Sequence, residues 1–313
     1  MARVLVTRQL PDGGLDPLTS AGHAIVQRND DTPFTPSELV AALADADALV
    51  CVLTDILDAP TIAAAAHLKV IANVAVGYNN IDLDAARAAG ITVCNTPGVL
   101  DDTTADLAFL LILAASRLAH DAESDLRADR WPGWAMNQYL GHDVHGATLG
   151  LVGFGRIGQA VARRATGFGM NVIHHTRADT GFTGWTPELH PLLQESDVVS
   201  VHVPLNPGTT HLIGPAEFGA MKSSAVFVNT SRGPVVDEAA LAQALTDDTI
   251  FAAGLDVFER EPAVHPALLA APRTVLLPHV GSATVATRTR MTRLAAQGCA
   301  DVLAGRVPPN SLA

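Results

Sequence analysis

Residues 148–158 read TLGLVGFGRIG, an apolar run followed by glycines at positions 153, 155 and 158. This order predicts a strand over 148–152, a tight glycine turn, and a helix from about 156 to 165. Glycines at this spacing let the chain turn, let the backbone approach a ligand closely, and let the helix pack against the strand. The helix N-terminus presents free N–H groups and a positive dipole end, which suit a pyrophosphate. We therefore predict a dinucleotide site that includes Gly153, Gly155, Arg156, Ile157 and Gly158; the alternative is a tight turn that binds no ligand.

Short β-rich runs alternate with Ala/Leu-rich helical stretches along the whole chain. After the glycine loop, strands are predicted at 171–175, 198–203, 225–229, 252–256 and 274–277, which completes one six-stranded nucleotide domain. In the first third, strands are predicted at 3–7, 24–28, 48–53, 70–73 and 92–94. Helices are predicted at 83–89 and in a stretch that opens with Thr35-Pro36-Ser37-Glu38. The predicted fold class is α/β, with two doubly wound domains of the Rossmann-like or flavodoxin-like kind.

Two longer helical stretches set the domain boundaries. The stretch 104–119 is predicted to be one helix that is hydrophobic nearly all round, so it must be buried in a core or against a partner subunit. A last helix over about 283–303 leaves the second sheet and is expected to return to the first domain. We therefore predict one domain made of residues 1–98 plus 283–313, and a dinucleotide-binding domain made of residues 99–282.

Composition excludes several classes of partner. The chain has 313 residues and a net charge of −12, so it has no basic surplus for nucleic acid or for an anionic membrane surface. A single well-placed arginine could still bind an anionic substrate. Cys51, Cys94 and Cys299 are far apart in sequence and lie in apolar stretches, which predicts buried, reduced thiols and no metal site. The apolar run 107–115 is too short to span a membrane. We expect a soluble, cytoplasmic protein.

The end of the strand after the glycine loop bears on the choice of dinucleotide. An NAD enzyme places Asp or Glu about here to bind the ribose hydroxyls, whereas this chain has Thr176 followed by Arg177. An arginine at this position favours a 2′-phosphate, so NADP is the predicted cofactor. Asp179 lies close enough in sequence to keep NAD possible, and Arg177 could also be a solvated loop residue. The preceding pair, His174 and His175, is expected to alternate across the strand.

Segments along nearly the whole chain resemble the D-isomer-specific 2-hydroxyacid dehydrogenase family. They are NVAVGYNNID (73–82), NTPGVLDDTTADLAF (95–109), VPLNPGTTHLI (203–213), VNTSRGPVVDEAAL (228–241), GLDVFEREP (254–262) and LPHVGSAT (277–284). The first two segments are most similar to the glyoxylate/hydroxypyruvate reductase branch of this family. The resemblance implies hydride transfer between NAD(P)H and a small 2-oxo acid that gives the D-2-hydroxy acid. It also implies an active site in the cleft between a substrate-binding first domain and the dinucleotide-binding domain.

Three residues match the catalytic positions of this family. Arg232 follows a strand at the carboxyl edge of the predicted sheet, and its fork could bind a carboxylate and polarise a ketone. His279 also follows a strand, and an imidazole can donate a proton in reduction and accept one in oxidation. The resemblance assigns Glu261 to orient His279. Taken alone, a loop arginine or a lone histidine after a strand is more often structural.

The resemblance also implies a wider set of contact residues. The cofactor contacts beyond the glycine loop and the strand end are Thr104, Pro204, Thr209, Thr230, Ser231, Asp256, His279 and Gly281. Asp256 could instead be a plain turn-forming carboxylate. The implied substrate contacts are Leu53, the backbone N–H groups of Val76 and Gly77, and the side chains of Arg232 and His279. Asn79 departs from the family, where Asp is common, and is expected to act as a turn residue.

Trp131-Pro132-Gly133-Trp134 resembles the segment that embraces the partner subunit in this family. We therefore expect a homodimer built on the helix at 104–119 and on this segment. Other 2-hydroxy acids, namely D-lactate and 3-phosphoglycerate, and also phosphite, are alternative substrates. A phosphorylated substrate should need extra basic residues, and the first domain has a single lysine, Lys69. A dinucleotide-sensing corepressor-like binding protein is an alternative of another class, which turnover of simple 2-oxo acids would distinguish.

Overall fold

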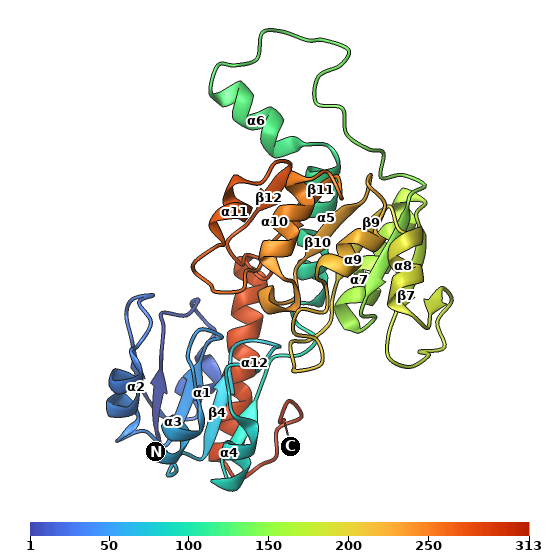
Figure 1. Ribbon diagram of the computed structural model, residues 1–313. Helices are drawn as coiled ribbons and strands as arrows, with labels where there is room; N and C mark the ends of the chain where they lie inside the picture. The colour runs from blue at the N-terminus through green and yellow to red at the C-terminus, as the bar shows by residue number, and fades with distance from the viewer. Residues whose placement is uncertain (313) are drawn as a thin grey trace. The chain divides into compact units, whose positions relative to one another are not determined.

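The computed structural model describes residues 1–312, which divide into two compact units (Figure 1). Unit 1 contains residues 1–100 together with the chain from residue 283 onward, and unit 2 contains residues 101–282. Each unit has its own parallel sheet with helices on both faces. The predicted α/β class with two doubly wound sheets is confirmed.

Unit 1 contains a five-stranded parallel sheet in the order β2-β1-β3-β4-β5. Its strands are β1 (Arg3–Val6), β2 (Ala24–Gln27), β3 (Ala48–Cys51), β4 (Val70–Asn73) and β5 (Thr92–Cys94). One face packs on α2 (Pro36–Leu43), α3 (Ala59–Ala64) and α4 (Leu83–Ala88), and the other on α1 (Asp16–Ser20) and α12 (Val285–Leu303). The strands are apolar at successive positions because helices cover both faces of the sheet. The last helix of the chain belongs to the first unit, since α12 contacts β3, β4 and β5.

Unit 2 contains a seven-stranded parallel sheet in the order β12-β11-β10-β9-β6-β7-β8. Its strands are β6 (Thr148–Val152), β7 (Asn171–His175), β8 (Trp185–Thr186), β9 (Val198–Val201), β10 (Val226–Asn229), β11 (Ala252–Leu255) and β12 (Thr274–Leu276). One face packs on α5 (Asp101–Ser116) and α7 (Arg156–Ala165). The other packs on α8 (Leu189–Glu195), α9 (Pro215–Ala220), α10 (Glu238–Thr246) and α11 (Pro266–Ala270). The order reverses between β6 and β9, which places a ligand site at the carboxyl ends of these strands.

The helix predicted over 104–119 is present as α5, but it ends three residues earlier, at Ser116. A second helix, α6 (Ala119–Arg127), follows it and is bent by 68° relative to α5. The break is at Leu118, which has a left-handed φ of 51°. The chain that returns after α6 contacts the end of α5 just before this residue. The N–H of His142 donates to the carbonyl of Ser116 at 2.8 Å. The helix therefore ends for a tertiary reason that local sequence does not show. The two-residue strand β8 was not predicted either.

Residues 119–140 form an arm that extends from the sheet of unit 2 (Figure 1). Helix α6 within it has no buried residue. Several large apolar side chains of the arm are exposed: Leu126, Trp131, Trp134, Met136 and Leu140. Within residues 1–312, no single helix is long and apolar enough to cross a membrane, and only the bent pair α5 and α6 meets that test together.

Candidate active site

The glycine loop of unit 2 has the geometry of a phosphate-binding turn. Gly153 has a φ of +98°, and a Cβ there would lie 2.8 Å from the carbonyl carbon of His202. A Cβ on Gly158 would lie 2.5 Å from the carbonyl oxygen of Gly153, so both positions exclude side chains. At Gly155, the N-cap of α7, a Cβ would have no described atom within 4 Å. Space is therefore open in front of a ten-residue helix whose first N–H groups lack side-chain caps.

Neutral side chains lie beneath and beside this loop. Burial lowers the pKa of His202 to about 4, and its Nε2 lies 2.9 Å from Oγ of Ser200. Burial also lowers the pKa of His174, whose ring stacks on Phe154 with centroids 3.8 Å apart. His174 is buried, whereas Nδ1 of His175 lies 3.0 Å from the carbonyl oxygen of Thr186. The imidazoles of His202 and His174 are therefore uncharged at neutral pH and do not compete with the dipole of α7 for an anion.

The loop after β7 holds the residues predicted to lie near the ribose of the cofactor. Arg177 is exposed. Thr176 uses its hydroxyl to donate to the carbonyl of Ala178 at 2.7 Å. The Asp179 carboxylate accepts the N–H of Gly181 at 2.8 Å and so acts as a turn residue here.

A second group of predicted residues gathers in unit 2 at the ends of β10, β11 and β12. Nδ1 of His279 lies 2.8 Å from Oε2 of Glu261, and Oε1 of Glu261 accepts the N–H of Phe258 at 3.0 Å. The two paired side chains are 26% and 28% exposed, so a small ligand can reach them. Arg232 follows β10 and is close enough to Glu261 for their charges to interact.

Opposing effects set the charges in this group. Burial raises the pKa of Glu261, but the hydrogen bond and charge of His279, the N–H of Phe258 and the charge of Arg232 outweigh it. The net pKa of Glu261 is lowered, so it is an anion at neutral pH. Burial lowers the pKa of Arg232, and the charge of Glu261 opposes that shift. A guanidinium remains protonated in proteins, so the group contains one fixed cation and one fixed anion around an imidazole.

Asp256 holds the loop that carries His279. Its Oδ1 accepts the N–H of Val280 at 2.7 Å, and its Oδ2 accepts the N–H of Gly281 at 2.8 Å. His279 itself has a left-handed φ of 53° and donates its N–H to the carbonyl of Asp256 at 2.9 Å. The hydroxyl of Thr104 donates to the carbonyl of Gly281 at 3.3 Å. Asp256 therefore orients the loop backbone, as the alternative reading of a turn-forming carboxylate expects.

The remaining predicted cofactor residues follow β9 and β10. The hydroxyl of Thr209 donates to the carbonyl of Pro204 at 2.7 Å, and the N–H and hydroxyl of Ser231 both donate to Oδ1 of Asn229 at 2.9 Å. Oγ1 of Thr230 is buried and has no hydrogen-bond partner among residues 1–312. A buried hydroxyl without a partner costs free energy, so a bound ligand would fit as its partner. This hydroxyl and the open space at Gly155 both fit a dinucleotide. No cluster of three potential metal ligands occurs among residues 1–312.

The predicted substrate loop lies in unit 1, after β4. Asn73 donates to the carbonyl of Gly77 at 2.9 Å, and Asn95 donates to the carbonyl of Val76 at 2.8 Å. Both asparagines are buried. Because they hold the carbonyls of Val76 and Gly77, they also restrict the directions of the backbone N–H groups in this loop. Leu53 is half-buried in the loop after β3.

The loop that contains Leu53 is closed by a buried ion pair. Asp55 and Arg8 are 3% and 5% exposed, and Oδ1 of Asp55 lies 3.1 Å from a guanidinium nitrogen of Arg8. Oδ2 of Asp55 accepts the N–H of Val52 at 2.9 Å. Sequence reasoning missed this pair and the two asparagines. The one sequence signal for the asparagines is a polar residue at the end of an apolar strand, as Asn73 is, or just after it, as Asn95 is.

Comparisons with known proteins agree with this geometry. Residues 109–281 match the family model described as D-isomer specific 2-hydroxyacid dehydrogenase, NAD binding domain. The chain is 43% identical to the glyoxylate reductase of Thermococcus litoralis over 317 residues, which covers 98% of this chain and 96% of that protein. A solved structure of a protein from Thermus thermophilus has a TM-score of 0.94 at 43% identity and covers 99% of this chain and 100% of that chain.

A further solved structure bears on the cofactor. It is an NADPH-dependent glyoxylate/hydroxypyruvate reductase from Sinorhizobium meliloti in complex with NADP and malonate. It has a TM-score of 0.89 at 34% identity and covers 100% of this chain and 97% of that chain. These similarities extend over both units and include the glycine loop. The protein is an oxidoreductase that uses a nicotinamide dinucleotide, and the chain belongs to the D-isomer specific 2-hydroxyacid dehydrogenase family.

Proposed function

We propose that this protein reduces small 2-oxo acids, above all glyoxylate and hydroxypyruvate, to 2-hydroxy acids. The observation that carries the proposal is the 2.8 Å contact between His279 and Glu261, with Arg232 beside it. This arrangement combines a proton donor, an anion that stabilises the protonated imidazole, and a cation for the substrate carboxylate. The full-length similarity to the glyoxylate reductase of Thermococcus litoralis supports this choice of substrate.

The geometry gives each of these side chains a separate task. Nδ1 of His279 faces Glu261, so Nε2 is the atom that donates a proton to the forming alkoxide. Arg232 binds the carboxylate and polarises the ketone, while Glu261 stabilises the imidazolium until the proton leaves. When bound, the reduced dinucleotide supplies the hydride that C2 of the substrate accepts. His279 is then reprotonated from solvent.

The proposal gives the loops of unit 1 a binding role. The N–H groups of Val76 and Gly77 bind the substrate carboxylate, and Leu53 contacts the rest of the substrate. Asn73 and Asn95 support this role, because both fix carbonyls of that loop. Preset N–H groups bind an anion without losing backbone freedom at the moment of binding.

NADP is the proposed cofactor. Arg177 is exposed at the end of β7, where a 2′-phosphate would lie, and the Asp179 carboxylate is engaged by the N–H of Gly181. Arg177→Ala should raise the KM for NADPH about tenfold and leave the KM for NADH unchanged, since one charge-assisted contact is removed. A wild-type enzyme that prefers NADH would contradict this part of the proposal.

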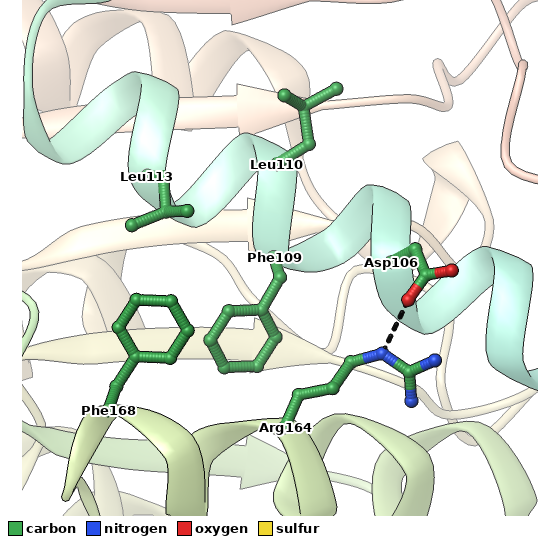
Figure 2. A pocket seen from close by; sticks show the side chains of 6 residues that line it. All are labelled: Asp106, Phe109, Leu110, Leu113, Arg164 and Phe168. Atoms are coloured by element: carbon green, nitrogen blue, oxygen red, sulfur yellow. Dashed lines mark hydrogen bonds and ion pairs between the residues drawn. The ribbon is translucent and has the colours of Figure 1, made fainter.

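We also propose a homodimer that uses α5 and the arm. An open groove of about 400 Å³ lies between α5 and α7, and Figure 2 shows the residues that line it. Phe109 stacks on Phe168 at 5.2 Å, Leu110 and Leu113 lie along α5, and Arg164 pairs with Asp106 at 2.6 Å. Leu110 is 52% exposed, so the groove leaves an apolar side chain of α5 uncovered.

The occupant proposed for this surface is a second copy of the chain. The arm carries Trp131, Trp134 and Met136 in exposed positions, residue types that are enriched at protein interfaces. Analytical ultracentrifugation should give twice the mass of one chain. Leu110→Glu should shift the protein to monomers, whereas Leu269→Glu, on an exposed leucine of α11, should not. A monomeric wild type at micromolar concentration would contradict the dimer.

The proposed activity is tested by following loss of reduced-nicotinamide absorbance with glyoxylate and with hydroxypyruvate, each with NADPH and NADH. We expect turnover with both acids and a loss of about 100- to 10,000-fold in kcat for His279→Ala. Arg232→Ala should lower kcat/KM to a similar degree while the affinity for the dinucleotide stays unchanged. Reduction of pyruvate in place of these acids, or reduction of the oxidised dinucleotide by 3-phosphoglycerate or phosphite, would reassign the substrate. Dinucleotide binding without any turnover would favour a sensor protein.

A further inference from the structure

One carboxylate holds both ends of the segment that carries Glu261. This segment runs from residue 259 to residue 265, after β11. An oxygen of Glu238 accepts the N–H of Glu259, and the other oxygen accepts the N–H of His265 at 3.1 Å. Glu261 lies between these two attachment points. Glu238 therefore restrains the backbone from which the Glu261 side chain projects.

Burial and several hydrogen bonds hold Glu238 in one position. It is the first residue of α10 and is 5% exposed. Its own N–H donates to Oε1 of Glu259 at 2.9 Å, so Glu238 and Glu259 bind each other reciprocally. The same oxygen of Glu259 lies 3.1 Å from Nε2 of His211. Buried carboxylates are costly unless they are fully bonded, and each of these bonds restricts the segment further.

The loop that carries Arg232 rests on the same segment. A Cβ on Gly233 would lie 1.8 Å from the carbonyl carbon of Phe258 and 2.3 Å from the nitrogen of Glu259. The two backbones therefore touch directly, and only glycine fits there. A displacement of the segment would change the positions of Glu261, which pairs with His279, and of Arg232, whose charge interacts with that of Glu261.

We propose that Glu238 is a positioning residue for the Glu261–His279 pair. It does not touch the reacting atoms; it sets the distance and direction between the Glu261 carboxylate and Nδ1 of His279. The inference rests on the proposed function for its kinetic readout, and on the hydrogen bond itself for a readout without substrate. The charged or titratable groups that face the pair are Arg232 and Asp256 in addition to the pair itself.

The test compares Glu238→Ala and Glu238→Gln with Asp237→Ala. Asp237 is the adjacent N-cap of the same helix, and its Oδ1 accepts the N–H of Ala240 at 2.9 Å. Asp237→Ala should weaken α10 without loosening the segment, which makes it a matched control. Three quantities are measured: kcat with glyoxylate over pH, dinucleotide affinity, and the downfield NMR resonance of the proton between His279 and Glu261, assigned with His279→Ala.

Glu238→Ala should lower kcat by about 10- to 100-fold, because small displacements of catalytic groups are that costly. Its activity should fall off at lower pH than that of the wild type, and the NMR resonance should shift or broaden, with unchanged dinucleotide affinity. Glu238→Gln keeps one acceptor oxygen, so its kcat, pH profile and NMR resonance should lie between those of the wild type and those of Glu238→Ala. It also serves as the test if the alanine variant does not fold. Asp237→Ala should lower the melting temperature alone.

Two outcomes would overturn the inference. One is a folded Glu238→Ala or Glu238→Gln with wild-type kcat, pH profile and NMR resonance. The other is Asp237→Ala with the same kinetic and NMR changes as Glu238→Ala, which would assign the effect to helix stability. If the wild type shows no turnover, the proposed function fails, yet the resonance still reports whether Glu238 positions the pair.

Discussion

The glycine loop of unit 2 and the loop after β4 in unit 1 both follow a parallel strand, and they are fixed by opposite means. At 153–158 the backbone is shaped by missing side chains, and a ten-residue helix follows at once. At 74–80 the backbone is shaped by side chains, because Asn73 and Asn95 bind its carbonyls. Beneath the first loop lies an uncharged His202, and in unit 1 the neighbouring loop after β3 is held by the charged pair Arg8–Asp55.

This difference separates what can be read from a sequence from what cannot. A loop shaped by sterics restricts residue type at each position, so it leaves a recognisable spacing of glycines. A loop shaped by amide hydrogen bonds leaves no such spacing, because many arrangements of asparagines can bind two carbonyls. Substitutions in the two loops should therefore differ in their effects on stability and on ligand binding.

The largest expected effect on stability is in unit 1. Asp55→Ala leaves Arg8 buried without its carboxylate and should lower the free energy of unfolding by about 3–5 kcal/mol. All three tryptophans lie in unit 2, so denaturant unfolding followed by far-UV circular dichroism and by tryptophan fluorescence separates the units. The midpoint from circular dichroism should fall more than the one from fluorescence. Asp84→Ala removes an exposed partner of Arg87 and should change neither midpoint. Equal shifts of the two midpoints in Asp55→Ala would contradict the assignment of this effect to unit 1.

Acid should act on unit 2 through His202. Its pKa is about 4 in the folded chain and near 6.5 when unfolded, so between these values the unfolded state binds the extra proton. Stability should therefore fall as pH falls through this window, by about 3 kcal/mol in total. His202→Gln cannot take up a proton and should show a flatter dependence in fluorescence-detected unfolding. An equally steep dependence in that variant would rule out His202 as the cause.

A smaller effect is expected when the loop of unit 1 loses one amide. Asn95→Ala removes the hydrogen bond to the carbonyl of Val76 and should cost about 1 kcal/mol of stability. If the loop binds the substrate carboxylate, the KM for glyoxylate should rise about tenfold with little change in kcat. Steady-state kinetics at saturating NADPH measure both parameters. An unchanged KM would remove the loop from the substrate site.

The smallest stability effect belongs to the glycine that faces open space. Gly155 has a negative φ and no neighbour within 4 Å of a Cβ, so unfolding of Gly155→Ala should be unchanged within error. Dinucleotide affinity, measured by calorimetry, should nevertheless fall, because the methyl group occupies the space of the phosphates. Gly153→Ala, at positive φ and against His202, should lose stability as well. Full affinity in Gly155→Ala would contradict the phosphate site.

The sequence predicted those features that local pattern specifies. The strand over 148–152 and the helix over 156–165 were placed to the residue, and the helix expected to open at Thr35-Pro36-Ser37-Glu38 is present as α2. The break between α5 and α6 was missed, because it depends on a hydrogen bond from His142, far along the chain. Arg232, Glu261 and His279 came from family resemblance, and their roles remain predictions. Glu238 was missed because its partners Glu259 and His265 are distant in sequence.

The central claim is that His279 donates the proton and that the Glu261 carboxylate stabilises the protonated form of His279. The most direct test is the pH dependence of kcat/KM for glyoxylate reduction in the wild type and in Glu261→Gln. The pKa of Glu261 is lowered, so its charge is present across neutral pH and is removed by the substitution. We predict that Glu261→Gln loses activity at distinctly lower pH than the wild type and is about 10- to 100-fold slower at neutral pH. Identical pH profiles and rates would contradict the account.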